Sequence, residues 1–300
     1  MNDRESHCEE KRVAMTHQSE KETAKSVTFE GYESALTFFK SQLWDEGGKE
    51  TLRYLKQKRR YTEEEIKDME LGFFPPQETA NLHLGDLMNV LGLTERGFGS
   101  THKLVIAYRD PWGRLKGFIV RRLTAQRPKF IYSAGTLRDT LFNSHLLGSD
   151  ATHAVVVEGY FDALIAAHRG IEGVVAIGGT RLTQQMLEDM IEKGIRRVTL
   201  IPDNDLRGQL GAVQSLQLIG EKGLHAFVVE LPPTVKDLDE FIRKMGIDAF
   251  KELKQQPLSG DRWREKYVKK KRDRIKVQIR TGDTTAQPSR IYYIKREEES

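Results

Sequence analysis

Three short apolar segments, each followed by acidic residues, constrain the fold of this chain more than any other feature. The segments are Ala154–Val157, Arg197–Pro202 and Ala226–Leu231. Short runs rich in β-branched residues are typical of buried strands in a parallel sheet. Helical periodicity covers residues 183–193 and 211–222, which lie between these runs. This alternation predicts an α/β domain in which helices flank a parallel sheet.

The acidic residues that follow the three strands are expected to gather at one edge of that sheet. They are Glu158, then Asp203 and Asp205, then Asp237 and Asp239. In open parallel sheets, ligands bind beyond the carboxyl ends of the strands. Carboxylate oxygens are the ligands that Mg²⁺ prefers in proteins. We therefore expect a site for divalent cations, although any one of these acids could instead cap a helix or face water.

Three neighbouring residues have roles that the pattern leaves open or makes structural. Gly159 allows the backbone to turn sharply and to approach a ligand. Asp162 opens a helix that we expect over Ala163–Arg169, so it could cap that helix or bind a cation. Lys236 could hold nucleotide phosphates or pair with Asp237.

The first half of the chain has a different pattern, in which helices precede a basic hairpin. A helical face begins at Tyr32, and Thr62 with Glu65 forms a capping-box signature. A further short helix is expected over His83–Leu91. The expected strands are Leu104–Tyr108, Leu115–Val120 and Phe130–Ser133, with a turn at Asp110–Gly113. We therefore expect a mixed α+β lobe over about residues 29–150, before an α/β domain over 151–248.

Basic side chains on and after the hairpin supply the charge opposite to that of the acids. They are Arg109, Arg121, Arg122 and Lys129. Guanidinium groups bind phosphate oxygens in bidentate fashion. Strand alternation sends Arg121 and Arg122 to opposite faces, so we expect at most one of them to face the acids. Such a cluster could also be a solvated basic hairpin. Ser133 is a further candidate contact to substrate, but no His/Asp set makes it a nucleophile.

Length and composition limit the class of protein. Three hundred residues, 38% of them hydrophobic, suffice for a core and about two domains. The single cysteine, Cys8, excludes a disulfide framework and a zinc ribbon built on cysteines. No apolar run approaches the ~20 residues that span a bilayer. Residues 1–26 lack the apolar region of a secretory signal, so we expect a cytoplasmic protein without membrane contact.

Both ends of the chain are strongly polar. Residues 1–28 have no apolar period, and we expect them to be a disordered leader. Between residues 261 and 280, ten Lys/Arg stand against three Asp/Glu, an excess larger than the net charge of +4 of the whole chain. We expect residues 249–300 to form a basic extension that either contacts nucleic acid or is simply solvated.

The acidic runs, taken together, resemble the motifs of the Toprim fold in the version found in bacterial-type DNA primases. The matching runs are Glu158-Gly159-Tyr160-Phe161-Asp162, Asp203-Asn204-Asp205 with Gly208, and Lys236-Asp237-Leu238-Asp239-Glu240. Further runs that resemble these enzymes are Leu71-Gly72-Phe73, Arg109–Arg114 with Gly117-Phe118 and Arg121-Arg122, Pro128–Ser133, and Gly178-Gly179-Thr180 with Leu182-Thr183. The similarity runs in order from about residue 50 to residue 245.

The resemblance implies a Toprim domain preceded by a primase N-terminal lobe, and an enzyme that synthesises short RNA primers on a DNA template by nucleotidyl transfer. It implies two or more Mg²⁺ or Mn²⁺ ions, with Glu158, Asp203 and Asp205 as catalytic ligands and Asp237 and Asp239 as further ligands. Contacts to nucleotide or template would come from Arg109, Arg121, Arg122, Lys129, Ser133 and Lys236. Gly159, Asp162 and Gly208 would support the site. The implied partners are single-stranded DNA, an RNA primer and ribonucleoside triphosphates, and a replicative helicase is left open.

Several departures from the family pattern keep other functions in view. The family usually has glycine where Asn204 stands, alanine at Arg207, proline at Leu238 and asparagine at Tyr132. The cysteines of a zinc-binding module and a Gly-x-x-x-x-Gly-Lys-Ser/Thr loop are both missing, a combination that suits a phage or mobile-element replication protein. The alternatives are a Toprim-type nuclease and a non-catalytic, primase-derived DNA-binding accessory protein.

Overall fold

The computed structural model describes residues 29–136 and 140–269. The chain divides into two compact units between Pro257 and Leu258. The disorder predicted for residues 1–28 and most of the predicted basic extension lie outside the described residues. Of that extension, the structure describes the end of a helix, a short strand β9 (Leu258–Ser259) and a helix over residues 260–269.

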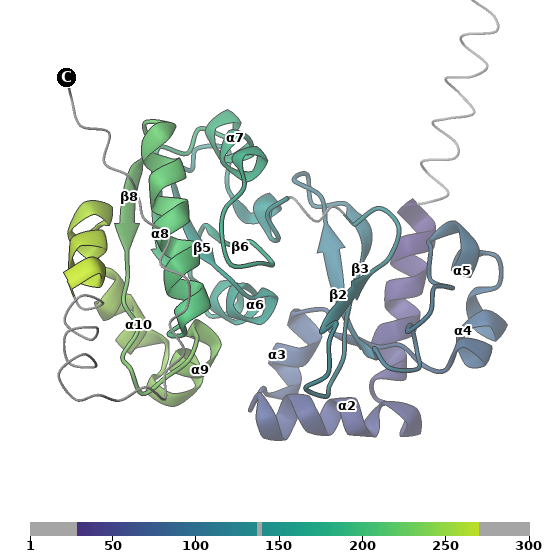
Figure 1. Ribbon diagram of the computed structural model, residues 1–300. Coiled ribbons are helices and arrows are strands. Elements are labelled where there is room, and N and C mark those ends of the chain that lie inside the picture. The colour runs from purple at the N-terminus through teal and green to yellow at the C-terminus, as the bar shows by residue number, and fades with distance from the viewer. Residues whose placement is uncertain (1–28, 137–139, 270–300) are drawn as a thin grey trace, which may run out of the picture. The chain divides into compact units, whose positions relative to one another are not determined.

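A parallel sheet carries the three acidic segments, as the alternation of strands and helices predicts (Figure 1). Its parallel strands are β5 (His153–Val157), β6 (Val174–Ala176), β7 (Arg197–Ile201) and β8 (His225–Val228). Strand β5 lies between β6 and β7, and its last residue, Val157, pairs with Ala176 and Ile201. The chain therefore leaves β5 and β7 at the same edge of the sheet, and the acids that follow both strands emerge there.

Helices alternate with these strands. They are α6 (Tyr160–His168), α7 (Gln184–Glu192), α8 (Leu206–Glu221), α9 (Leu238–Met245) and α10 (Ile247–Lys254). The helix predicted over 183–193 is confirmed and is capped by Thr183, whose hydroxyl accepts a hydrogen bond from the Met186 N–H. Helix α8 begins at Leu206, earlier than the predicted residue 211. Its first turn therefore follows Asp205 directly.

Helices precede the basic hairpin, as the sequence predicts. One helix covers residues 29–42, and the next elements are η1 (Glu46–Gly48), α2 (Lys49–Arg53), the π-helical turn η2 (Tyr54–Lys58) and α3 (Glu63–Asp68). Both hydrogen bonds of the predicted capping box at Thr62 and Glu65 are present. The single helix predicted over His83–Leu91 is wrong. Two helices, α4 (Gln77–Leu84) and α5 (Leu87–Val90), are separated by Gly85, which has a φ of +51°.

The basic hairpin belongs to an antiparallel sheet. Its strands, in spatial order, are β1 (Gly72–Phe73), β2 (Leu104–Arg109), β3 (Leu115–Arg121) and β4 (Phe130–Tyr132). At the predicted turn, Asp110 Oδ1 accepts hydrogen bonds from the Trp112 and Arg114 N–H groups, 3.0 Å each. These bonds hold the turn rigidly between β2 and β3.

Both faces of this antiparallel sheet are buried. Alternate residues of β2 enter two different cores, because successive side chains of a strand point to opposite faces. Leu104 and Ile106 join a cluster that also contains Val155 and Val157 of β5. Val105 packs with Phe39 and other residues of the helical segment. Among the described residues, no helix has both the length and the apolar character needed to cross a membrane.

Candidate functional site

The ends of strands β5 and β7 meet at the candidate site. Glu158 follows β5, and its Oε1 accepts a hydrogen bond of 3.0 Å from the backbone N–H of Asp203, which follows β7. A Cβ on Gly208, in the first turn of α8, would lie 2.3 Å from that same oxygen. A glycine at position 208 therefore lets the start of α8 approach Glu158 closely. The supporting role predicted for Gly208 stays a prediction, and this close approach is the contact that would produce it.

Two of the predicted ligands also cap helices. Asp205 Oδ1 accepts a 2.9 Å hydrogen bond from the Gly208 N–H at the start of α8. Asp237 Oδ1 accepts a 2.9 Å hydrogen bond from the Glu240 N–H at the start of α9. The capping role that the sequence left open is thus real for both residues. Because each carboxylate has a second oxygen, capping does not prevent either residue from binding a cation.

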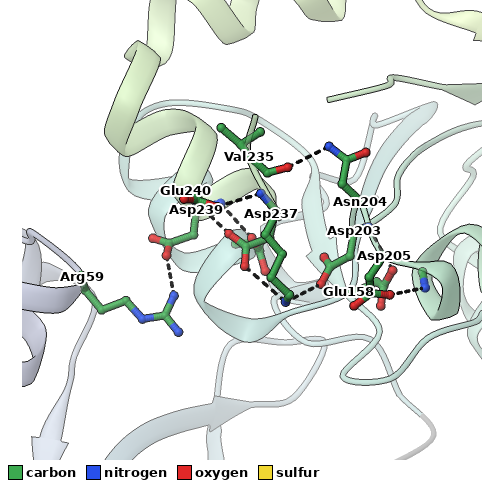
Figure 2. Close-up of polar contacts among 12 residues, drawn as sticks. Arg59, Glu158, Asp203, Asn204, Asp205, Val235, Asp237, Asp239 and Glu240 are labelled. Carbon is green, nitrogen blue, oxygen red and sulfur yellow. Dashed lines mark hydrogen bonds and ion pairs between the residues drawn. The ribbon is translucent and has the colours of Figure 1, made fainter. Parts of the chain in front are cut away.

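The ammonium group of Lys236 pairs with acids of two different loops, Asp203 and Asp237, which are labelled in Figure 2. Its Nζ is 3.1 Å from Asp203 Oδ2 and 3.6 Å from Asp237 Oδ2. The structure therefore favours the pairing with Asp237 that the sequence left open, and it adds Asp203 as the closer partner. Burial alone would lower the pKa of Lys236, but Asp203, Asp237 and Asp205 together raise it.

Asn204, between the two acids of the second motif, fixes the loop that carries Lys236. Its side-chain Nδ2 donates to the carbonyl oxygens of Leu231 (3.1 Å), Pro232 (2.8 Å) and Val235 (2.8 Å). Its backbone N–H donates to the Lys236 carbonyl oxygen at 2.7 Å. The sequence showed Asn204 only as a departure from the family pattern, because its partners lie about thirty residues downstream.

Asp162 has a structural contact that the sequence could not assign. The side chain is buried, and its Oδ1 accepts a 2.8 Å hydrogen bond from the Asp239 N–H at the start of α9. Burial and the nearby Asp237, Asp203 and Asp239 raise the pKa of Asp162 well above its usual value. Asp162 therefore ties α6 to α9. Gly159 precedes α6, where a Cβ would lie 2.2 Å from Asp162 Oδ2.

Asp239 differs from the other predicted metal ligands, because both of its oxygens are already engaged. Its side chain is fully buried. The Tyr61 hydroxyl donates to Oδ1 at 2.6 Å, Arg59 pairs with Oδ2, and Arg243 lies 3.1 Å from Oδ2. Arg59 and Tyr61 are not among the site residues predicted from the sequence, where their only signal is a basic and aromatic cluster before the capping box. The metal role predicted for Asp239 stays a prediction, and the structure gives this residue a second task.

The charges at the site repel one another. Burial, followed by the charges of Asp203 and Asp205, raises the pKa of Glu158 to about 7. Burial also raises the pKa of Asp203, although Lys236 opposes this shift. Clustered carboxylates that resist ionisation indicate excess negative potential, which a cation would relieve.

The donor set fits a hard divalent cation. Within residues 29–136 and 140–269, no group of three His, Cys, Asp or Glu side chains is arranged to hold a metal ion as it stands. Glu158, Asp205 and Asp237 each direct one carboxylate oxygen to a backbone N–H, which leaves a second oxygen on each residue. Yet the group is all carboxylate, carries excess negative charge and already attracts the ammonium of Lys236. These are the properties expected of residues that bind Mg²⁺ or Mn²⁺.

Of the basic residues predicted on and after the hairpin, Arg121 and Lys129 are the two whose pKa values are influenced by acids of the site, Arg121 by Asp239 and Lys129 by Asp237. Arg121 is 8% exposed, and its guanidinium group lies over the rings of Tyr54, Phe130 and Phe161. Its buried Nε has no hydrogen-bond partner among the described residues. Burial, together with the charges of Arg121, Lys236 and Arg59, lowers the pKa of Lys129. A buried guanidinium group with an unused donor is suited to an anionic ligand.

The other predicted contacts have different surroundings. Arg122 Nη1 donates to Gln126 Oε1 at 2.6 Å on the surface. Arg109 forms a bidentate pair with Glu70. Within the part of the chain that the structure describes, it forms no hydrogen bond or ion pair with the acidic loops. Ser133 is buried, and its hydroxyl accepts from the Phe118 N–H at 2.8 Å. Their roles in binding nucleotide or template remain predictions.

Comparisons with known proteins agree with this architecture. Residues 155–242 match the family model described as Toprim-like. The DNA primase of Staphylococcus aureus (strain COL) is 28% identical over 224 residues, which cover 68% of this chain and 37% of that protein. The chain thus matches little more than a third of the length of this relative.

Two solved structures share the fold. The RNA polymerase domain of Mycobacterium tuberculosis primase DnaG superposes with a TM-score of 0.69 at 22% identity, covering 79% of this chain and 85% of that one. A DnaG primase catalytic domain bound to single-stranded DNA superposes with a TM-score of 0.64 at 22% identity, covering 79% and 81%. This chain therefore contains a Toprim-like domain, has the fold of the DnaG primase catalytic core, and has DNA primases as its sequence relatives.

Proposed function

We propose that this protein is a DNA primase, which synthesises short RNA primers on a single-stranded DNA template from ribonucleoside triphosphates. The observation that carries the proposal is the convergence of Glu158, Asp203, Asp205 and Asp237 from three separate loops at one edge of the parallel sheet. Relatives that are named DNA primases support the reaction. A structural neighbour bound to single-stranded DNA supports the nature of the template.

The four acids would hold Mg²⁺ or Mn²⁺ ions. Asp239 would support them by anchoring the start of α9, next to Asp237, to Arg59 and Tyr61. When bound, such ions neutralise phosphoryl oxygens and the leaving pyrophosphate. The chain itself positions the acids. Gly208 admits the start of α8 to Glu158, Asn204 fixes the third loop, and Asp162 connects α6 to α9. This preorganisation spares the reaction the free-energy cost of gathering like charges.

The basic groups would receive the phosphates of nucleotide and template. Arg121 is the strongest candidate, because its guanidinium group is buried against aromatic rings and retains an unused donor. Lys129 would add a second positive charge, and burial, followed by the cations around it, lowers its pKa. We propose that the lobe of residues 29–150 binds the phosphates and that the domain of residues 151–248 holds the divalent cations.

The departures from the family pattern do not disturb the acids. Leu238 is the first residue of α9 and is buried, directly after the capping Asp237. Arg207 is exposed in the first turn of α8. The Tyr132 hydroxyl lies 3.2 Å from the Tyr160 hydroxyl, near the start of α6. The structure therefore offers no specific support for a non-catalytic accessory protein.

A primer-synthesis assay tests the proposal. The protein is incubated with a single-stranded template, labelled ribonucleotides and Mg²⁺ or Mn²⁺. We expect labelled oligoribonucleotides, whereas template fragments would indicate a nuclease, and retention of template without products would indicate a binding protein. Glu158→Gln and Asp203→Asn should abolish synthesis. Glu188→Gln should leave synthesis unchanged, because Glu188 is a surface acid on α7 that pairs with Lys222, away from the acidic loops.

A further inference from the structure

Lys236 competes for the oxygens that the proposed function assigns to divalent cations. Its Nζ lies 3.1 Å from Asp203 Oδ2 and 3.6 Å from Asp237 Oδ2 (Figure 2). Among the described residues, the ion pairs recorded for these two acids come only from Lys236. Since an ammonium group and a divalent cation cannot both occupy the space in front of one oxygen, occupation by one must disfavour the other.

The backbone of Lys236 is fixed, whereas its side chain can leave. The Lys236 carbonyl accepts a 2.7 Å hydrogen bond from the Asn204 N–H. The Lys236 N–H donates to Glu240 Oε2 at 2.7 Å. The side chain is 56% exposed, and a lysine stem rotates about four bonds. The ammonium group can therefore move away from the acids without any change in the loop.

The proposed substrate supplies a second anion for the same ammonium group. A nucleoside triphosphate brought to the acids carries several phosphate oxygens, and lysine binds phosphate as a compact point charge. Once Asp203 and Asp237 hold another cation, the ammonium group loses its carboxylate partners. A nearby phosphate then becomes its best available partner.

We propose that Lys236 is a built-in counter-ion, which competes with divalent cations for Asp203 and Asp237 and is released to bind the phosphates of the incoming nucleotide. The proposal rests on the proposed function, because it assumes that these acids hold cations. It orders the two binding events, since cation binding releases the group that nucleotide binding uses. If Lys236 only contacted phosphate, replacing it would leave the affinity of Asp203 and Asp237 for divalent cations unchanged.

A titration of the whole chain with Mn²⁺ tests the competition without any catalysis. Electron paramagnetic resonance of the free ion measures how much Mn²⁺ remains unbound. Lys236→Gln removes the ammonium group, and we expect it to tighten Mn²⁺ binding about tenfold. Lys236→Arg keeps the charge and should stay near the unmodified affinity. Lys244→Gln is the matched control, because Lys244 is an exposed lysine nearby on α9 that pairs with Glu240 and with neither Asp203 nor Asp237. It should change the affinity less than about twofold, since solvent and salt screen exposed charges.

Nucleotide binding at saturating Mn²⁺ tests the second half of the proposal. With a fluorescent non-hydrolysable ribonucleoside triphosphate, Lys236→Gln should weaken binding about five- to tenfold, in the direction opposite to its effect on Mn²⁺. Lys244→Gln should leave nucleotide affinity unchanged. Thermal unfolding of both variants verifies that they remain folded.

The outcomes separate this proposal from the proposed function. If Lys236→Gln leaves Mn²⁺ affinity unchanged or weakens it, while Asp203→Asn abolishes binding, the competition does not occur although the acids still form the cation site. If Lys236→Gln tightens Mn²⁺ binding without weakening nucleotide binding, the release to phosphate is overturned. If Asp203→Asn and Glu158→Gln bind Mn²⁺ as the unmodified protein does, the proposed function fails.

Discussion

Gly208 controls how closely helix α8 approaches the end of strand β5. A Cβ at this position would lie 2.3 Å from Glu158 Oε1 and 2.7 Å from the Asp203 carbonyl oxygen. We expect Gly208→Ala to displace both acids and to reduce primer synthesis about a hundredfold, because small misplacements of reacting groups are costly. The free energy of unfolding should fall by about 1–3 kcal/mol through overpacking. Primer yield and thermal unfolding measure the two effects.

Gly220, in the same helix, provides the control. An added Cβ there would meet nothing within 4 Å. Gly220→Ala should stabilise the protein by up to about 1 kcal/mol, because alanine has the higher helix propensity, and primer synthesis should be unaffected. If Gly208→Ala and Gly220→Ala lost activity equally, the loss would come from any substitution in α8. The close approach of Gly208 to Glu158 would then not explain it.

At the level of residues, the sequence predicts which acids come together, but it does not predict all the partners that each one contacts. Glu158, Asp203 and Asp237 follow strands whose order can be inferred, so their convergence is predictable. The partners of Asn204 and Asp239 are not predictable in this way. Asp239 meets Arg59 and Tyr61, from a segment about 180 residues earlier. Without pairing information, no local pattern connects such distant residues.

A partly buried histidine links strands β5 and β7 by a side-chain hydrogen bond, and its lowered pKa makes stability depend on pH. The His153 imidazole Nε2 lies 2.9 Å from the hydroxyl of the buried Thr199. Burial, followed by the charge of Arg197, lowers the pKa of His153 to about 4. In the unfolded chain this pKa is about 6.5. Between these two values the unfolded state binds a proton that the folded state does not.

We therefore expect the protein to lose stability as the pH falls from 6.5 to 4. The contribution of His153 is fully present above pH 6.5, and its loss should lower the free energy of unfolding by about 1–2 kcal/mol, since the imidazole is only partly buried. Urea unfolding at several pH values measures this slope. His153→Gln should flatten the curve over this range, whereas His225→Gln, on the exposed start of β8, should not. An unchanged slope in His153→Gln would assign the pH dependence to other groups.

The turn between β2 and β3 presents an aromatic side chain to solvent. Trp112 is 77% exposed, although Asp110 fixes its backbone and the Arg114 guanidinium group lies 5.1 Å from the centre of its ring. A side chain this exposed contributes little to the core. An exposed aromatic ring beside a cation is a stacking platform for single-stranded nucleic acid.

If the proposed function is correct, an oligothymidylate should quench the fluorescence of Trp112. Trp112→Leu should abolish most of the quenching and weaken binding of the oligonucleotide about five-fold or more, as expected for the loss of one stacked base. Trp44→Phe is the control, because Trp44 is 36% exposed and lies between two lysines. Quenching that persists in Trp112→Leu would exclude stacking at this turn.

At the level of elements, long periodic segments are predictable, whereas two of the very short strands are not. The strands β2, β3, β5 and β7 follow from runs of apolar residues. Strand β1 has two residues and β6 has three, too few to show a period. The division between α4 and α5 also escapes the pattern, because Gly85 interrupts an apolar period that otherwise continues across it.

Ion pairs join the helical segment near residue 60 to the domain that carries the acids. Arg59 pairs with Asp239 of α9, and Arg169, just after α6, pairs with Glu65 of α3. Asp239 is fully buried, and the Arg59 side chain is 14% exposed. Burial alone would lower the pKa of Arg59, but Asp239 raises it. These contacts connect segments that the sequence separates by more than a hundred residues.

Asp239→Asn distinguishes this connecting role from the metal role that the sequence predicts. The substitution leaves Arg59 and Arg243 facing a neutral amide, and we expect a loss of about 2–4 kcal/mol in the free energy of unfolding, because uncompensated buried charges are costly. Mn²⁺ affinity should fall less than about threefold, because both oxygens of Asp239 already serve Arg59, Arg243 and Tyr61.

Asp237→Asn should show the opposite pattern. Asparagine caps a helix about as well as aspartate, so the free energy of unfolding should change by less than about 1 kcal/mol. Mn²⁺ affinity should fall about tenfold or more, because a carboxylate that faces the other acids is lost. Chemical unfolding and Mn²⁺ titration of both variants provide the comparison. If Asp239→Asn instead abolishes Mn²⁺ binding while the protein keeps its stability, Asp239 is a metal ligand and its pairs with the arginines are incidental.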